Sequence, residues 1–232
     1  SLDWIESNGD DIAAVLVEPV QSRHPLLQPK AFLQRLRAIT EAKGAALVFD
    51  EIVTGFRVHP GGMQAVFGVK ADLATYGKVV GGGMPIGILA GTARFMDALD
   101  GGMWRYGDES VPETAPTFFA GTFVRHPLVL AAAKAVLTHI EAAGPALHEG
   151  LARRMDGLVD TLNRDLERRG LATRVEGYSS WFYLSFASCA CSAYTCRKAI
   201  PASSRQLIPT PTSRPLKLPS PRCWMQCRVQ AP

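Results

Sequence analysis

The stretch AALVFDEI, residues 45–52, decides the fold class of this chain. Its five consecutive apolar residues have no alternating polar positions, which is typical of a strand buried on both faces. A second run of this kind, AAVLVEPV, occupies residues 13–20. Between them, after Pro29 and before Gly44, helical spacing places on one face Phe32, Leu33, Leu36, Ile39 and Ala42. Strand, helix and strand without a solvated strand face predict an α/β fold, in which helices cover a mostly parallel sheet.

The alternation of predicted strands and helices continues along the chain. DLATYGK (residues 72–78) and IGILAGT (86–92) are predicted strands, and a helix is expected over 93–99. A longer helix is predicted at 127–143, and another begins at Pro145 and has Arg168 and Arg169 near its C-terminal end; the strands LATRVEG and WFYLSF follow them. We therefore expect residues 1–143 to be part of a large domain, and residues 144–186 to begin a small α+β domain.

Composition changes abruptly after residue 186. Residues 1–186 hold 18 basic and all 21 acidic residues, whereas residues 187–232 hold seven basic residues, all five cysteines and no glycine. Such a tail cannot bury enough apolar surface to offset chain entropy, so we predict disorder or out-of-frame translation. Nucleic-acid binding by the basic tail and zinc binding by its cysteines are alternatives, but its charges are scattered and its cysteine spacing is irregular.

No apolar run of about 18 residues and no signal sequence are present, so we expect a cytoplasmic protein without membrane insertion. The chain begins with Ser1, and a predicted strand follows soon after it. We interpret this start as a position inside a longer reading frame.

Carboxylates and a lysine mark the ends of predicted strands. Asp50 and Glu51 end one strand, and Lys78 ends another directly before a glycine-rich turn. Ligands of open α/β sheets collect at the carboxyl ends of strands, which makes this edge the candidate site. The glycines do not have the spacing of a phosphate loop, and no dinucleotide fingerprint or hydrolase elbow occurs. The five histidines lack an i, i+4 pair, so no metal site is predicted.

Four motifs in order carry a family resemblance: VLVEPV (15–20), VFDEIVTGFR (48–57), YGKVVGGGMPIG (76–87) and GTFVRHPL (121–128). They resemble the signatures of class III aminotransferases, which are fold type I enzymes dependent on pyridoxal 5'-phosphate. This group includes glutamate-1-semialdehyde 2,1-aminomutase. The ending RVEGYSSWFYLSF resembles the aminotransferase modules of hybrid peptide and polyketide synthetases.

The resemblance implies roles for three residues at the strand ends. Lys78 would hold the cofactor as a Schiff base and, when displaced by a substrate amine, would move the proton. Asp50 would pair with the pyridine nitrogen and favour its protonated form, which makes the ring an electron sink. Ile52 resembles the apolar residue that stacks on one face of the ring, although a core isoleucine is equally compatible with its position.

Other residues follow from the same motifs. Thr122 resembles a donor to the cofactor phosphate of a neighbouring subunit, which implies a homodimer, and Gly121 would allow close approach of the chain. Glu18, in the family's Glu-Pro pair, and Glu51 are expected to support the site. Arg57 is compatible either with binding a substrate carboxylate or with a surface salt bridge.

The implied activity is transamination between an amino acid and a keto compound, both small molecules, either free or attached to a carrier protein. An aminomutase, which runs both half-reactions on one substrate, is an alternative, and a truncated domain without catalysis is another. Family members are longer, and their phosphate-binding loop lies upstream of the motifs present here. We therefore expect a fragment whose own activity requires testing.

Overall fold

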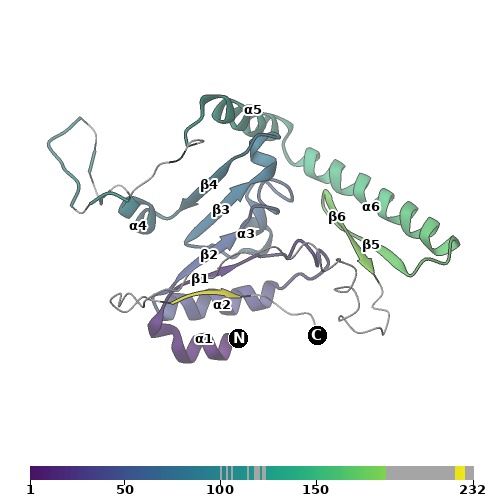
Figure 1. Cartoon of the computed structure of the whole chain (residues 1–232), viewed down its shortest axis with the longest axis horizontal. Coiled ribbons are helices and arrows are strands. Elements are labelled where there is room, and N and C mark those ends of the chain that lie inside the picture. Colours follow the sequence, from purple (N-terminus) through teal and green to yellow (C-terminus); the bar gives the residue numbers. More distant parts are fainter. Residues whose placement is uncertain are drawn as a thin grey trace, which may run out of the picture.

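A five-stranded sheet lies at the centre of the computed structural model, in the order β4-β3-β2-β1-β7 (Figure 1). Its strands are β1 (Ile12–Val17), β2 (Ala46–Asp50), β3 (Leu73–Gly77), β4 (Gly87–Gly91) and β7 (Cys223–Cys227). β1 pairs in parallel with β2 and β7, and β2 pairs in parallel with β3, whereas β4 runs antiparallel to β3. The sheet is therefore mostly parallel, as the sequence predicts.

The structure describes residues 1–99, 101–102, 104–105, 107–113, 115–117, 121, 124–186 and 223–227. Of the predicted tail, 187–232, only the backbone of β7 is described, and it lies beside β1 with Val15 opposite Met225. The rest of this tail lies outside the described residues. The predictions made for it, which are disorder, out-of-frame sequence, zinc binding and nucleic-acid binding, therefore stay predictions. Among the described residues, no group of three or more His, Cys, Asp or Glu side chains is placed to hold a metal ion.

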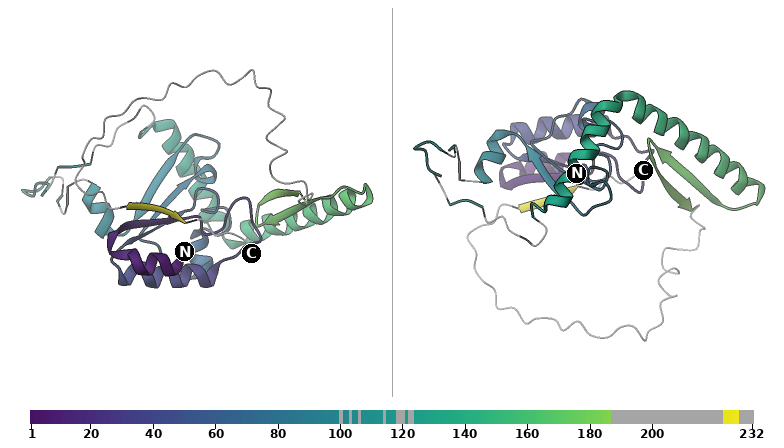
Figure 2. Two further views of the ribbon diagram at one scale, coloured as in Figure 1. Left: turned by 60° about the horizontal axis from the view of Figure 1, so that its bottom comes forward. Right: turned by 90° about the horizontal axis from the view of Figure 1, so that it is seen from above.

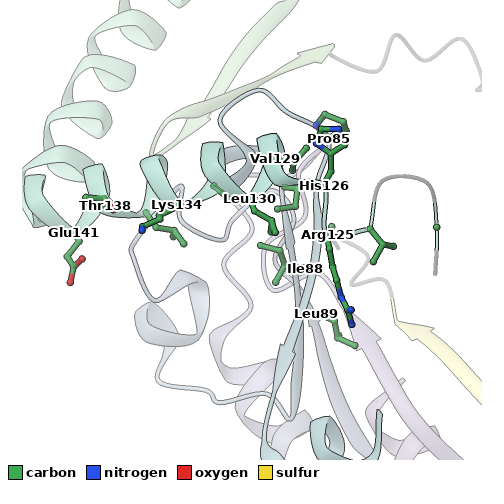
Figure 3. A pocket seen from close by; sticks show the side chains of 16 residues that line it. Pro85, Ile88, Leu89, Arg125, His126, Val129, Leu130, Lys134, Thr138 and Glu141 are labelled. Atoms are coloured by element: carbon green, nitrogen blue, oxygen red, sulfur yellow. The ribbon is translucent and has the colours of Figure 1, made fainter. Parts of the chain in front are cut away.

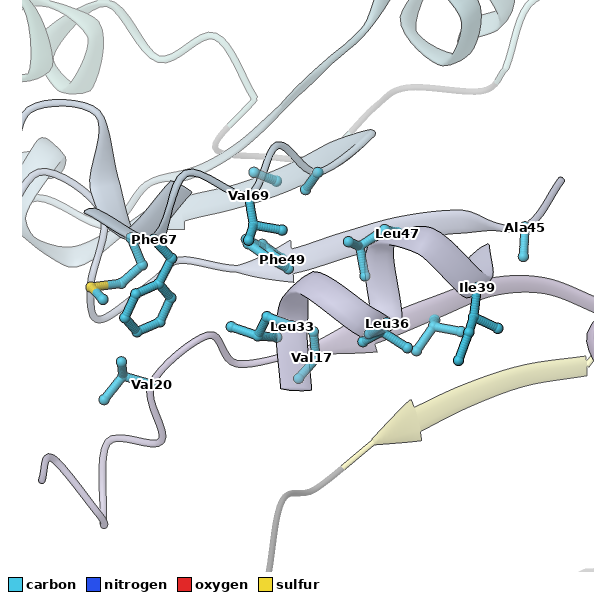
Figure 4. Packing of buried hydrophobic residues seen from close by; sticks show 14 of the residues in the cluster. Val17, Val20, Leu33, Leu36, Ile39, Ala45, Leu47, Phe49, Phe67 and Val69 are labelled. Carbon is cyan, nitrogen blue, oxygen red and sulfur yellow. The ribbon is translucent and has the colours of Figure 1, made fainter. Parts of the chain in front are cut away.

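Helix α2 (Lys30–Ala42) packs its apolar face against the sheet, and α1 (Leu2–Asn8) lies beside it (Figures 1 and 2). The core between α2 and the strands consists of buried side chains from both (Figure 4): Leu33, Leu36, Ile39, Val17, Leu47 and Phe49. Burial of each large aliphatic side chain contributes about 1.5–3 kcal/mol, so this face holds α2 in place. Ala42 departs from the prediction because it lies exposed at the last turn of the helix.

Several short helices surround the sheet. They are α3 (Gly62–Phe67), α4 (Ala93–Met96) and single 3-10 turns at Gly9–Asp11, Lys78–Gly81 and Asp97–Leu99. The helix predicted over 93–99 is thus divided into α4 and a 3-10 turn. The sequence did not predict α1 or α3, because helices of seven and six residues are too short to establish an apolar period.

Helix α5 (Pro127–Ala143) has the predicted bounds, and α6 (Pro145–Arg168) begins at the predicted residue; the two meet at Gly144, where the chain bends by 91°. The hairpin of β5 (Thr173–Tyr178) and β6 (Trp181–Phe186) packs against α6 (Figure 1). Among the described residues no single helix has the length and hydropathy to cross a bilayer; α5 and α6 meet that criterion only as a bent pair. The division at residues 143/144 into two domains stays a prediction.

Candidate active site

The ends of β2 and β3 bring the predicted carboxylate and lysine to one edge of the sheet. Asp50 is the last residue of β2 and stands opposite Thr75 in the parallel register, and Lys78 directly follows β3. The hydroxyl of Thr75 donates to Asp50 Oδ1 at 3.4 Å, and the backbone N–H of Ile52 donates to the same oxygen at 3.1 Å. The carboxylate is therefore fixed through one of its oxygens.

The second carboxylate oxygen of Asp50 remains available. Within the described part of the chain, Oδ2 has no hydrogen-bond partner, and the side chain is only half-buried. A carboxylate held by Oδ1 presents Oδ2 to a ligand without further rearrangement. This is the geometry that an acceptor for a protonated ring nitrogen requires.

Lys78 sits at a strained turn at the end of β3. Its backbone is left-handed, with φ of 48°, a conformation that non-glycine residues adopt rarely and that occurs often at functional sites. Gly77 precedes it in extended conformation, and a Cβ on Gly77 would lie 3.1 Å from the carbonyl oxygen of Ile86. The exposed Lys78 side chain forms no hydrogen bond or ion pair with any other described residue.

Ile52 lies beside this turn, as the resemblance implies. Its Cγ2 is 3.6 Å from the position that a Cβ of Gly77 would occupy, and the side chain is partly exposed. An apolar side chain thus borders the space between Asp50 and Lys78. This position is compatible with stacking on a planar ring, and that role stays a prediction.

Glu51 points away from this edge into the protein. Its side chain is 0% exposed, and its Oε2 accepts a hydrogen bond from the hydroxyl of Thr54 at 2.7 Å. The nearby Tyr76 has a raised pKa, because burial and then the charge of Glu51 disfavour the phenolate, whereas a hydrogen bond from Gln64 acts in the opposite direction. Glu51 therefore does not face the space between Asp50 and Lys78.

Glu18 and Arg57 each make hydrogen bonds to the backbone. Glu18 follows β1, and its Oε2 accepts from the backbone N–H of Ser22 at 3.1 Å. The guanidinium of Arg57 donates to the backbone oxygens of Val53 at 3.0 Å and Ser180 at 3.3 Å. It forms no salt bridge among the described residues, so the surface ion pair considered from the sequence is not what the structure contains.

Arg57 instead connects two parts of the chain. Ser179, at the turn between β5 and β6, donates its hydroxyl to the Arg57 carbonyl oxygen at 3.1 Å. His148 of α6 contacts the carbonyl oxygen of Phe56 at 3.1 Å. Desolvation lowers the pKa of Arg57 from its ordinary value. The loop after β2 is therefore fastened to the helix–hairpin unit.

Gly121 lies at a groove of about 1100 Å³ between β4 and α5 (Figure 3). Ile88 of β4 and Leu130 of α5 face each other across it, and Arg125 and His126 line its other side. Asp50 and Lys78 do not line this groove, so it is not the space between the strand ends. Thr122, to which the resemblance gives a phosphate contact, lies outside the described residues.

The strand-end residues fit the cofactor that the resemblance implies. The donor set offers a carboxylate oxygen and an amine that have no partners within the described part of the chain, at the ends of adjacent strands. Gly77, which has no side chain, directly precedes Lys78. These groups suit the ring nitrogen and the aldehyde carbon of pyridoxal 5'-phosphate.

Thr75 is a site residue that sequence reasoning missed. It supports Asp50 directly, yet a threonine in a strand is ordinary and carries no signal of its own. Aligning the two predicted strands in parallel, with Lys78 just beyond the second, would have placed Thr75 beside Asp50. The register that makes this alignment certain comes only from the structure.

Comparisons with known proteins point to one family. The family model "Aminotransferase class-III" matches residues 2–178. A glutamate-1-semialdehyde 2,1-aminomutase of Pyrobaculum aerophilum is 40% identical over 176 residues, which are 73% of this chain and 39% of that protein.

Solved structures give the same result. An omega-transaminase from Sphaerobacter thermophilus matches with a TM-score of 0.65 and 36% identity, covering 80% of this chain and 40% of that one. A transaminase with PLP bound matches with a TM-score of 0.66 and 31% identity, covering 79% and 41%. The fold is thus that of these transaminases, and the chain spans about two fifths of the length of the proteins it matches.

Proposed function

Because this chain belongs to the class-III aminotransferase family, we propose that it is part of a pyridoxal-phosphate-dependent transaminase and supplies the residues that hold the cofactor ring and its aldehyde carbon. Such an enzyme transfers an amino group between a small-molecule amino donor and a keto acceptor. The observation that carries the proposal is the placement of Asp50 and Lys78 at adjacent strand ends, with Thr75 fixing one carboxylate oxygen and leaving the other available.

Each residue has a defined task in this reaction. Pyridoxal phosphate, when bound, supplies an electron sink for the electron pair left on a substrate carbon that loses its proton. Asp50 Oδ2 would accept a hydrogen bond from the ring N–H and favour that protonated nitrogen. Lys78 Nζ would bind the aldehyde carbon and, once replaced by a substrate amine, would carry the proton as a base. Ile52 would exclude water from one side of the ring.

An aminomutase remains the second candidate, because a relative that is 40% identical carries that name. Both activities use the same residues, so the difference lies in the fate of the keto compound after the first half-reaction. Release of a free keto product into solution favours a transaminase. Retention of that product, followed by return of the amino group to a different carbon, favours an aminomutase.

A homodimer is part of the proposal. The resemblance directs Thr122 to the phosphate of a neighbouring subunit, and the groove beside Gly121 is bordered by partly exposed apolar side chains such as Leu130 and Leu137. Light scattering during size-exclusion chromatography tests the association. A cytoplasmic location and carrier-bound substrates also belong to the proposal; cell fractionation tests the first, and activity with carrier-attached keto compounds tests the second.

Cofactor attachment tests the proposal directly. The purified chain is mixed with pyridoxal phosphate, reduced with borohydride and digested, and the modified peptide is identified by mass spectrometry. We expect one modified lysine, Lys78, which disappears in Lys78→Ala and persists in Lys70→Ala, a matched change of an exposed lysine. A chain that is folded by circular dichroism but carries no adduct on Lys78 would instead support a truncated domain without catalysis.

A further inference from the structure

Glu51 is a buried carboxylate without a cationic partner. Its side chain is 0% exposed, and no lysine, arginine or histidine of the described residues lies within ion-pair distance. A buried charge is costly unless hydrogen bonds compensate it. Three donors do so: the hydroxyl of Thr54 at 2.7 Å and the backbone N–H groups of Met63 at 3.0 Å and Gln64 at 3.2 Å. The local structure is therefore built around this carboxylate.

These contacts fasten α3 to the end of β2. The N–H groups of Met63 and Gln64 belong to the first turn of α3, where no intrahelical acceptor is available. Gly62 is left-handed, with φ of 62°, and a Cβ there would lie 2.5 Å from Glu51 Oε1. The glycine thus lets the helix start approach the carboxylate closely, and Glu51 fixes α3 relative to Asp50, its neighbour in the chain.

The side chain of Gln64 continues the connection to the end of β3. Its Nε2 donates to the hydroxyl of Tyr76 at 3.1 Å, and its Oε1 accepts from the backbone N–H of Ala71 at 2.9 Å. The Tyr76 ring packs against Phe56, with centroids 5.3 Å apart, and against Gly55 in the turn that follows Glu51. Tyr76 precedes Lys78 by two residues. The end of β3 is therefore connected to Glu51 through Gln64 and Tyr76.

We propose that Glu51 is a positioning residue that fixes the placement of Lys78 relative to Asp50, acting through α3, Gln64 and Tyr76. This proposal rests on the proposed function, because the placement of Lys78 relative to Asp50 matters for activity only if both residues hold the cofactor. Glu51 touches neither the strand-end space nor a ligand in it, and acts only through the residues that it holds. If Glu51 served only to anchor α3, the hydrogen bond from Gln64 to Tyr76 of β3, the strand that directly precedes Lys78, would not be needed.

Two variants break the connection at different points. Glu51→Gln replaces one acceptor oxygen by an NH₂ group that faces N–H or O–H donors. Its control is Glu41→Gln, which makes the same change on an exposed residue of α2. Gln64→Leu removes the link to Tyr76 and Ala71 but keeps the backbone contact with Glu51. If Glu51→Gln fails to fold, Gln64→Leu still tests the connection.

Amide hydrogen exchange of the full chain is the first measurement and requires no cofactor. In both variants we expect exchange in the peptide around residues 73–79 to rise roughly tenfold, the effect of losing a buried hydrogen bond. In Glu41→Gln the exchange should be unchanged. Faster exchange confined to α3 and the turn after Glu51, with residues 73–79 unchanged in Gln64→Leu, would overturn the proposal and leave Glu51 as a helix anchor.

The second measurement is the visible circular dichroism of pyridoxal phosphate bound to Lys78, divided by the amount bound. Both variants should lose signal per bound cofactor, because the ring orientation depends on Asp50 and Lys78 together. A purely structural role would lower the amount bound and leave the signal per cofactor unchanged, which would contradict the proposal. If the unaltered chain binds no cofactor, the proposed function fails, and the exchange measurement still decides the role of Glu51.

Discussion

Asp50 uses its two carboxylate oxygens differently. Oδ1 accepts from Ile52 and Thr75, while Oδ2 has no partner among the described residues. Lys78 has a left-handed backbone, and its amine has no partner within the part of the chain that the structure describes. At the scale of single residues, the site is thus a carboxylate oriented by its neighbours and an amine held in a strained turn.

Asp50→Asn separates the charge of this residue from its structural contacts. The amide oxygen can accept the same two hydrogen bonds, so the fold should be retained, whereas the negative charge proposed to face the cofactor ring is lost. We expect the rate of amine consumption by the cofactor-loaded protein to fall roughly 10²–10³-fold. Stopped-flow absorbance measures this rate. Thr75→Val, which keeps the charge, serves as the control and should have a smaller effect; equal rates in Asp50→Asn and the unaltered chain would contradict the assignment.

Tyr76 gives a prediction for alkaline pH. Burial, followed by the charge of Glu51, raises the pKa of Tyr76 above its ordinary value, so the folded protein favours the neutral phenol. An unfolded tyrosine ionises near pH 10, so the stability from the neutral phenol is complete below about pH 10 and is lost as pH rises through the folded pKa.

Urea unfolding at about pH 8 and about pH 11 measures this loss. Tyr76→Phe should lose less stability between the two pH values than the unaltered chain. Burial also raises the pKa of Tyr178, so part of the loss should persist in Tyr76→Phe and disappear in the double phenylalanine variant. An equal loss in all three proteins would show that neither phenol is linked to folding.

At the scale of elements, short segments connect the long ones. Helix α3 is joined to β2 through Glu51 and to β3 through Gln64. The loop after β2 is joined to the β5–β6 turn through Arg57 and Ser179. The surroundings of the site therefore depend on the six-residue helix α3 and on turns as well as on the sheet.

Gly62 and Gly68, at the two ends of α3, form a matched pair that tests the contact between the start of α3 and Glu51. Both are left-handed, with φ of 62° and 66°, so alanine at either position should cost about 1–2 kcal/mol of backbone strain. Only at Gly62 would the new Cβ also meet the Glu51 carboxylate, whereas nothing lies within 4 Å at Gly68.

We therefore expect Gly62→Ala to be the more destabilising of the two. The difference in the free energy of unfolding, measured in urea, isolates the contact with Glu51 from the strain that both positions share. Equal destabilisation by Gly62→Ala and Gly68→Ala would mean that the start of α3 moves away at little cost. That outcome would weaken the case for a rigid connection.

At the scale of the whole molecule, one core cluster connects the described elements from α1 to the hairpin. The main cluster of buried apolar residues in the described part runs from Ile5 to Trp181, and Trp181 joins the helix–hairpin unit to it. Trp181 and Tyr178 pack edge to face at 5.2 Å. The hairpin is thus part of the same folded body as the sheet.

Removal of residues 187–232 tests the predicted tail. Because the core cluster of the described residues already joins α1, α2, β1, β2, β3 and the hairpin, the chain ending at Phe186 should keep its far-UV circular dichroism and its cooperative melting. Loss of β7 would expose the edge of β1, and exposed strand edges promote association, so light scattering should accompany the melting experiment. Loss of cooperative melting would show that the tail is an integral part of the fold.

The sequence by itself determined the order of β1 to β6 with α2, α5 and α6, the bounds of α5, the start of α6, and the strand-end positions of Asp50 and Lys78, because these depend on local periodicity and residue type. The tertiary structure decided which strands are neighbours. Only that register places Thr75 against Asp50, buries Glu51 under α3 and turns Arg57 toward the hairpin. These contacts join residues far apart in the chain, and their side chains are ordinary polar groups, so no local pattern distinguishes them before the strands have packed.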